Sequence, residues 1–227
     1  MSTCGRFVVV IPAHNEQDTL DDCLASVTSA AHALREASVD IVLVLDDCDD
    51  GSAEIARRHS EIEVLTITAA RVGAARAAGA TYALVGCSPD DLTRTWLATT
   101  DADSVVPVGW LVHHQRIAHA GADALIGAVV PRLDELDPVR AGRWRASHPP
   151  GATLGHVHGA NLGVRASAYR AAGGFPSIGE DEDVDLVRAL RAADASITET
   201  EDAPVVTSAR LKGRAPHGYA DYLAALA

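Results

Sequence analysis

Two carboxylates one residue apart, Asp101 and Asp103, follow the apolar run 96–100. In an extended backbone, side chains alternate between two faces, so both acids would point to the same side. Carboxylate oxygens are hard ligands that suit Mg²⁺ or Mn²⁺, which typically keeps bound waters and shares a substrate phosphate. Because open α/β sheets bind ligands at the carboxyl ends of their strands, the spacing predicts a metal site there. A solvated turn is the alternative interpretation.

Asp46 and Asp47 form a second acidic group, at the end of the apolar run 39–45. In a doubly wound sheet this group and the Asp101/Asp103 group lie on one rim. Clustered carboxylates raise one another's pKa unless a cation is present, and a bound metal would remove that penalty. For the neighbouring Asp49 and Asp50, simple turn-filling is the favoured interpretation.

A third acidic group, residues 180–185, precedes Val187 and Leu190 on a helical face. The positive end of a helix dipole stabilises acids in the first turn. It also favours the ionised form that a general base needs near neutral pH. Capping explains any single one of these acids, but four in succession exceed what capping requires.

Histidines and arginines give weaker signals. His156 and His158 could share one side of a strand, but no third ligand stands at a spacing typical of zinc, so no zinc site is predicted. Guanidinium groups bind phosphates well. The candidates for contacting a diphosphate are Arg71, Arg76, Arg210 and Arg214.

Composition narrows the class of protein. The chain has 227 residues, of which 48% are hydrophobic and 4% aromatic, with a formal net charge of −12. This length allows one substantial aliphatic core. The negative charge argues against a nucleic-acid partner or a broad anionic-membrane surface, although peripheral membrane contact stays open. The four cysteines lack C-x-x-C spacing, so neither a zinc site nor a disulfide framework is predicted. No apolar run approaches the length of a membrane span. We therefore expect a cytoplasmic protein.

The first hundred residues alternate strand and helix patterns. Strands are predicted at 7–11, 39–45, 63–68 and 96–100, and helices at 20–36, 52–59 and 72–85, with Asn15 capping the first helix. This alternation predicts an α/β fold with a mostly parallel, doubly wound sheet.

The second half is less regular. The sequence predicts a helix at 107–120, a strand at 124–130, and a long loop or partly ordered insertion at 132–155. Helices at 165–172 and 184–192 and short strands near Ile197 and Val205 follow. We therefore expect one domain, 1–227, with a nucleotide-binding half at about 1–104 and an irregular acceptor-binding half at about 105–227.

Six motifs, taken in order, resemble family 2 glycosyltransferases with the GT-A fold. They are the opening strand and turn 9–16, Asp46-Asp47-Cys48, the helix start 72–76, Asp101-Ala102-Asp103, the glycine-containing segment 159–163, and 182–186 at the head of a helix. The resemblance spans roughly residues 7 to 195. The acidic second strand end lacks the family's usual Gly-Ser and Thr-Asp run, which leaves the contacts of Asp46 and Asp47 open.

The resemblance implies roles by position. Pro12, Ala13 and Glu16, with Asp46 or Asp47, would line the nucleoside pocket, and Arg76 would lie near the diphosphate. Asp103 would bind the metal directly, Asp101 would face the ribose or the metal, and Ala102 would lie between them in the donor site. Gly159, Ala160 and Asn161 would let the backbone approach the sugar and acceptor. Asp183, with Glu182 beside it, matches the base, and His217 is the candidate third metal ligand.

The implied activity is transfer of a sugar from a nucleotide-diphosphate donor to an acceptor hydroxyl, dependent on Mg²⁺ or Mn²⁺ and proceeding with inversion. The acceptor would be a small molecule or lipid-linked. The chain lacks the membrane helices of polymer-making members, which argues against processive extrusion of a polysaccharide. Three alternatives remain: a retaining GT-A transferase, a sugar-phosphate nucleotidyltransferase, and a non-catalytic nucleotide-sugar binding module. Residues 12–20 lack the basic, glycine-rich loop usual in nucleotidyltransferases.

Overall fold

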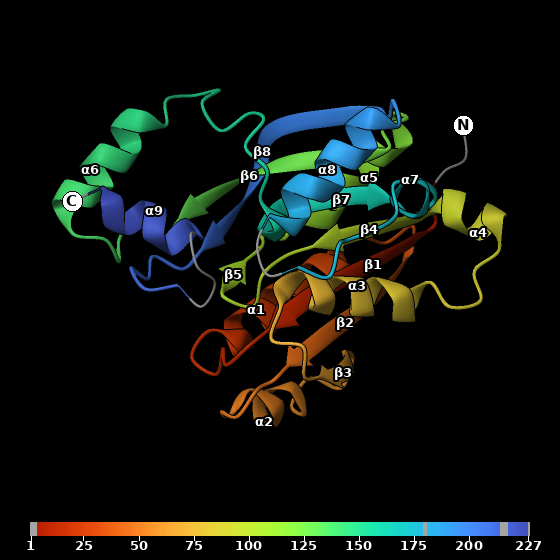
Figure 1. Ribbon diagram of the computed structural model, residues 1–227, viewed down its shortest axis with the longest axis horizontal. Helices are drawn as coiled ribbons and strands as arrows, with labels where there is room; N and C mark the ends of the chain where they lie inside the picture. The colour runs from red at the N-terminus through yellow and green to blue at the C-terminus, as the bar shows by residue number, and fades with distance from the viewer. Residues whose placement is uncertain (1–3, 179–180, 214–217, 227) are drawn as a thin grey trace.

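A single mixed sheet positions all the other elements. In the computed structural model, which describes residues 4–178, 181–213 and 218–226, eight strands pair in the order β3-β2-β1-β4-β7-β6-β8-β5 (Figure 1). The pairings β3-β2, β2-β1, β1-β4 and β6-β8 are parallel, whereas β7 is antiparallel to both β4 and β6, and β5 is antiparallel to β8. The strands are β1 (Arg6–Ala13), β2 (Ser38–Asp46), β3 (Glu63–Ile67), β4 (Thr95–Thr99), β5 (Ser104–Val105), β6 (Ala124–Pro131), β7 (Leu162–Arg165) and β8 (Ile197–Thr207).

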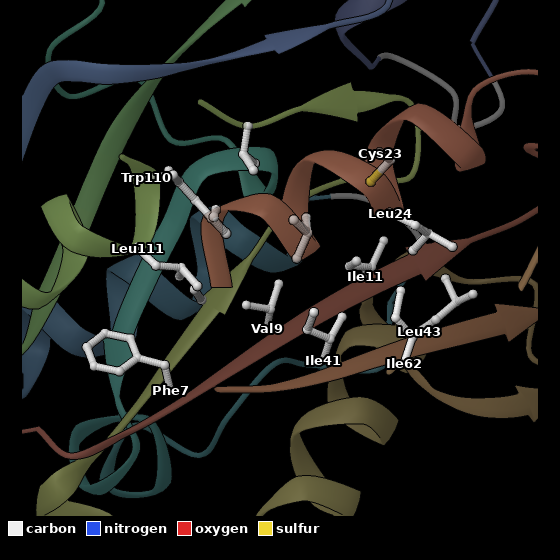
Figure 2. Close-up of a cluster of buried hydrophobic side chains, with 14 of the residues drawn as sticks. Phe7, Val9, Ile11, Cys23, Leu24, Ile41, Leu43, Ile62, Trp110 and Leu111 are labelled. Carbon is white, nitrogen blue, oxygen red and sulfur yellow. The ribbon is translucent and has the colours of Figure 1, made fainter. Parts of the chain in front are cut away.

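Strand β1 is apolar on both faces because helices cover both sides of the sheet. Phe7, Val9 and Ile11 pack with α1 (Leu20–Ala33) and α5 (Trp110–His119) in the cluster of Figure 2. The alternate residues, Val8 and Val10, pack with α3 (Val72–Ala83) and α8 (Glu182–Ala192) on the opposite face. The α/β class and the two-sided helical cover are therefore confirmed, as is a continuous apolar run in a strand buried on both faces.

Two details of the first half differ from expectation. Asn15 does not cap α1; it has φ 56° and its Oδ1 accepts a hydrogen bond from the Asp49 backbone amide at 2.8 Å, so it closes the loop beside β2. Thr19 is the residue before α1, without a side-chain cap. A helix absent from the prediction, α4 (Pro89–Arg94), begins with a capping box between Ser88 and Asp91.

The second half corrects two predictions. The expected loop 132–155 contains α6 (Pro138–Ser147), whose first amides, those of Val139 and Arg140, donate to the Asp137 carboxylate at 3.0 and 3.1 Å. The strands expected near Ile197 and Val205 are one long strand, β8, whose pairing with β6 shifts register between Gly127 and Val129. The remaining elements are α2 (Ser52–Ala56), the 3₁₀ turn η1 (Gly159–Asn161), α7 (Ala166–Ala171) and α9 (Tyr219–Ala225).

Helices α6 and α9 lie together at one end of the molecule, at the left of Figure 1. They enclose a small core of their own, made by Leu136, Ala141, Trp144, Ala209 and Leu223. Nothing among the helices of the described residues has both the length and the apolar character needed to cross a membrane.

Candidate active site

One pocket of about 860 Å³ opens where β1, β2 and β4 end. The first turn of α8, the turn η1 and the α6/α9 end of the molecule complete its walls. Twelve of the sequence-predicted residues line it: Pro12, Ala13, Glu16, Asp46, Arg76, Asp101, Ala102, Asp103, Gly159, Ala160, Glu182 and Asp183. The carboxyl ends of parallel strands are where this class of sheet binds ligands.

Asp46 lies at the end of β2 and holds the loop that follows β3. Its Oδ1 accepts from the backbone amides of Ala69 and Ala70 at 2.7 and 2.8 Å, and its Oδ2 accepts from the amide of Arg71 at 2.9 Å. Ala70 has φ 49°, a left-handed conformation that a non-glycine residue adopts at a cost. The buried carboxylate therefore stabilises a strained turn that forms one wall of the pocket.

Asp101 and Glu182 are joined by Arg76. The buried guanidinium forms ion pairs with both carboxylates, one at the end of β4 and the other in the first turn of α8. The Nε of Arg76 is buried and has no hydrogen-bond partner in the described part of the chain. Arg76 therefore lies in the floor of the pocket and connects the two sides of the site.

Gly159 lies against this ion-pair network. A Cβ at this position would overlap the guanidinium of Arg76, so only glycine lets η1 approach so closely. The Gly159 amide donates to Asp183 Oδ2 at 2.5 Å, and its carbonyl accepts from Thr99 Oγ1 at 2.6 Å. Asp183 Oδ1 accepts from the Val184 amide at 2.7 Å. These bonds fix the Asp183 carboxylate at the edge of the pocket.

Asp103 shares an arginine with Glu16. Arg210 Nη2 lies 2.9 Å from Asp103 Oδ2, and its Nη1 donates to both oxygens of Glu16 at 2.8 and 2.9 Å. Burial raises the pKa of Asp103 to about 6; the carboxylates of Asp101 and Glu16 add to the increase, and Arg210 opposes it. Arg210 therefore leaves the negative charge of this corner incompletely compensated.

The donor set at this corner fits a divalent cation. Asp103 and Asp101 offer hard carboxylate oxygens, and nearby positive charge would favour the ionised form of Asp103, whose pKa is raised mainly by burial. Within residues 4–178, 181–213 and 218–226, no three His, Cys, Asp or Glu side chains are arranged to hold a metal. Mg²⁺ commonly binds through one or two carboxylates, with substrate phosphates and waters completing its shell, so two carboxylates are sufficient.

The opposite wall carries aromatic and imidazole rings that the sequence interpretation did not assign. His148, His156, His158, Tyr219 and Tyr222 line the pocket there. His148 stacks on Trp144, with ring centroids 4.2 Å apart, and His158 packs edge-on against Tyr219 at 5.6 Å. Burial lowers the pKa of His158, which keeps this imidazole neutral near pH 7. The i, i+4 spacing of Trp144 and His148 was the available sequence signal.

The loop between α6 and η1 is anchored through Glu201 of β8. Its carboxylate accepts from the backbone amides of Gly151 and Thr153 at 2.7 and 3.1 Å and from Thr153 Oγ1 at 2.6 Å. Thr153, like the rings, lines the pocket. This wall is therefore held in place by β8 rather than by the loop alone.

Two of the predicted residues that the structure describes, Asp47 and Asn161, do not line the pocket. Asp47 is exposed, with φ 53°, and is not among the residues that line the pocket. Asn161 is buried: Trp110 Nε1 donates to its Oδ1 at 2.9 Å, and its amide donates to the Ala128 carbonyl at 2.8 Å. The Asn161 side chain is thus used within the fold, and the approach of its backbone to a sugar stays a prediction. His217 and Arg214 lie outside the described residues. Arg71 and Arg210 line the pocket, as expected of diphosphate candidates.

Solved structures share this α/β architecture. The chain is 12% identical to Staphylococcus aureus TarS residues 1–349, with a TM-score of 0.67 over 90% of this chain and 60% of that one. It is 18% identical to the mannosyltransferase PcManGT from Pyrobaculum calidifontis, with a TM-score of 0.63 over 92% of this chain and 58% of that one. It is 15% identical to glucosyl-3-phosphoglycerate synthase from Mycobacterium tuberculosis, with a TM-score of 0.54 over 88% and 69%. These likenesses define a GT-A type α/β fold.

The sequence itself gives the family. The model of glycosyl transferase family 2 matches residues 8–172, and the chain belongs to that family. No curated protein sequence matches it significantly. The chain spans 60% and 58% of the lengths of the TarS fragment and PcManGT, respectively.

Proposed function

We propose that this pocket binds a nucleotide-diphosphate sugar and transfers the sugar to an acceptor hydroxyl with inversion, using Asp183 as the base. The observation that carries the proposal is that Asp103 and Asp183 line one pocket from two separate parts of the chain, the turn between β4 and β5 and the start of α8. Matched solved structures support the donor class. TarS was solved with UDP, PcManGT with GDP-Man and Mn²⁺, and glucosyl-3-phosphoglycerate synthase with UDP and Mg²⁺.

On the donor side, Pro12, Ala13 and the loop held by Asp46 would line the nucleoside, in the half formed by about residues 1–104. Asp103, with Asp101 beside it, would hold Mg²⁺ or Mn²⁺. When bound, such a cation supplies positive charge to the departing diphosphate. The guanidinium groups of Arg71 and Arg210 reach the same pocket and can add hydrogen bonds to phosphate oxygens.

On the acceptor side, Asp183 takes the proton as the acceptor oxygen attacks the anomeric carbon and the bond to the diphosphate oxygen breaks. A single displacement of this kind inverts the anomeric centre. The first turn of α8 and the Gly159 amide hold the Asp183 carboxylate in place at the edge of the pocket. Glu182, which the sequence interpretation placed beside the base, is paired with Arg76 and is proposed as a positioning residue.

The acceptor would lie between Asp183 and the wall of His148, His158 and Tyr219, in the half formed by about residues 105–227. Aromatic and imidazole faces bury the apolar faces of ring-shaped molecules, and their polar edges contact hydroxyl groups. This supports a small-molecule or lipid-linked acceptor that presents a sugar-like ring.

The test is a thermal-shift screen of UDP-, GDP- and dTDP-sugars with Mn²⁺ or Mg²⁺, followed by measurement of nucleoside diphosphate release from the best donor. We expect one donor to raise the melting temperature and to be turned over, with EDTA abolishing turnover. NMR of the product's anomeric proton would show inversion. Binding without release or transfer would contradict the proposal and favour a non-catalytic binding module.

A further inference from the structure

Arg210 occupies the corner in which the divalent cation is proposed to bind. Its guanidinium contacts Glu16 through Nη1 and Asp103 through Nη2, all at 2.8–2.9 Å. The side chains of Glu16 and Asp103 are only 8% and 11% exposed, whereas that of Arg210 is 31% exposed. The arginine thus reaches into a buried acidic corner from the pocket side.

The oxygens of Asp103 are already engaged. Oδ1 accepts from the Ser104 and Thr207 hydroxyl groups at 3.2 and 3.3 Å, and Oδ2 faces Arg210. A divalent cation bound to Oδ2 would lie within a few ångströms of the guanidinium. At such a separation, like charges in a partly buried site repel strongly. A metal ion and the present position of Arg210 therefore exclude each other at Asp103.

The backbone beside Arg210 is tied to the same corner. The Ser208 amide donates to the Asp103 carbonyl at 3.1 Å, and the Arg210 amide donates to Ser208 Oγ at 3.2 Å. When a metal ion binds Asp103, the Arg210 side chain can therefore rotate away while its backbone stays in place. The guanidinium has five N–H donors, so Nη1 can stay on Glu16 while the other end turns to a new acceptor.

The other cations of the described pocket lining are not placed to compete. Arg76 is buried between Asp101 and Glu182. The Arg71 side chain donates to the carbonyl oxygens of Ala69 and Ser177, both at 3.4 Å.

We propose that Arg210 is a resident cation that pairs with Asp103 while no metal is bound, and that it turns from Asp103 to the donor diphosphate when the metal and nucleotide bind. This rests on the proposed function. Because the metal must displace Arg210, the free protein should bind metal weakly. The diphosphate gives the displaced guanidinium a new partner, so nucleotide and metal should strengthen each other's binding through Arg210.

The test measures Mn²⁺ binding without nucleotide, by the electron paramagnetic resonance signal of free Mn²⁺. Arg210→Met removes the competing cation, and we expect it to bind Mn²⁺ about tenfold more tightly than the wild type, a difference of ~1.4 kcal/mol. Arg210→Gln, which keeps hydrogen bonding to the carboxylates without the charge, should show the same direction. Arg191→Met is the matched control, since Arg191 pairs with Glu199 outside the pocket at 2.9 Å, and should bind Mn²⁺ as the wild type does.

A second measurement follows the diphosphate. Saturating UDP or GDP should increase Mn²⁺ affinity more in the wild type than in Arg210→Met. If neither Arg210 variant tightens Mn²⁺ binding although Asp103→Asn abolishes it, the inference on Arg210 is overturned and the metal site stands. If Mn²⁺ binding does not depend on Asp103 at all, the metal role in the proposed function falls as well.

Discussion

Arg76 of α3 and Glu182 of α8 form an ion pair in the floor of the pocket, where each side chain is only 4% exposed. The same guanidinium pairs with Asp101 at the end of β4. Three elements that are distant in sequence therefore meet at one buried cation. Arg76 thus links Asp101 to the first turn of α8, which also carries Asp183.

Removing Arg76 should be costly. Arg76→Met leaves Glu182 and Asp101 without their buried partner, and loss of one member of a buried pair typically costs ~3–5 kcal/mol. Urea unfolding of the variant against the wild type measures this difference. The double variant Arg76→Met/Glu182→Gln removes one of the stranded charges and should recover part of the loss. If the free energy of unfolding of Arg76→Met lies within about 1 kcal/mol of the wild type, Arg76 does not hold these elements together.

Gly159→Ala tests the close approach of η1 to Arg76. The added methyl group overlaps the guanidinium, so the turn must move away and carry with it the amide that bonds Asp183. We expect transfer activity to fall by more than the loss of folded protein explains. Gly142→Ala is the matched control, because its Cβ meets nothing within 4 Å and lies in helix α6. That control should be neutral or gain up to about 1 kcal/mol. Equal activity in the two variants would count against the turn's role.

The pH dependence of stability should carry a contribution from His114. Burial lowers the pKa of this imidazole to about 3, and Trp96 Nε1 donates to its Nδ1 at 3.1 Å. Between pH 6.5 and 3 the unfolded chain binds a proton that the folded chain does not. Stability therefore falls as the pH falls, by ~1.4 kcal/mol per unit.

His114→Asn keeps an acceptor for Trp96 and removes the titration. Between about pH 7.5 and pH 5, the wild type should lose about 2 kcal/mol more than this variant in urea unfolding. The comparison uses the pH-dependent change within each protein, so a constant stability difference does not matter. Parallel curves for the two proteins would show that His114 is not buried in its neutral form.

Substitutions of Asp46 and Asp47 should have different effects on stability and on nucleotide binding. Asp46→Asn replaces a carboxylate oxygen with an amide that cannot accept from the loop at 69–71, which we expect to cost about 1–3 kcal/mol and to weaken nucleotide binding. Asp47→Asn changes an exposed side chain and should alter neither property by more than about 0.5 kcal/mol. Urea unfolding measures the stability of the two variants, and calorimetric titration with the preferred nucleoside diphosphate measures their nucleotide binding. A larger loss of nucleotide binding in Asp47→Asn than in Asp46→Asn would show that Asp47, and not Asp46, supports the nucleoside-binding wall.

The sequence was sufficient for elements whose signal is local. The two-sided apolar run of β1 and the helical spacing of α1 and α3 predicted the doubly wound half, because these patterns follow directly from burial. Helix α6 was missed because its composition is polar and its Trp144 is buried in a small core that includes Ala209 and Leu223, which are distant in the sequence.

In the site, too, local motifs were predicted from the sequence, whereas contacts between distant segments were not. The ordered motifs identified twelve of the residues that line the pocket, but not what each side chain contacts. Arg76 pairs with acids 25 and 106 positions away, and nothing in its local sequence distinguishes it from an arginine facing a phosphate. Asn161 stands in a motif typical of ligand contact, yet its amide is used by Trp110 and the Ala128 carbonyl. Partners of this kind are set by tertiary packing.

The most direct test of the account compares nucleotide binding and sugar transfer in Asp103→Asn and Asp183→Asn, with the exposed Asp185→Asn as control. Asp103→Asn should lose metal-dependent nucleotide binding. Asp183→Asn should bind the donor as the wild type does but turn it over at least about 100-fold more slowly, and Asp185→Asn should match the wild type. Wild-type turnover by Asp183→Asn would contradict the central claim that this carboxylate is the base.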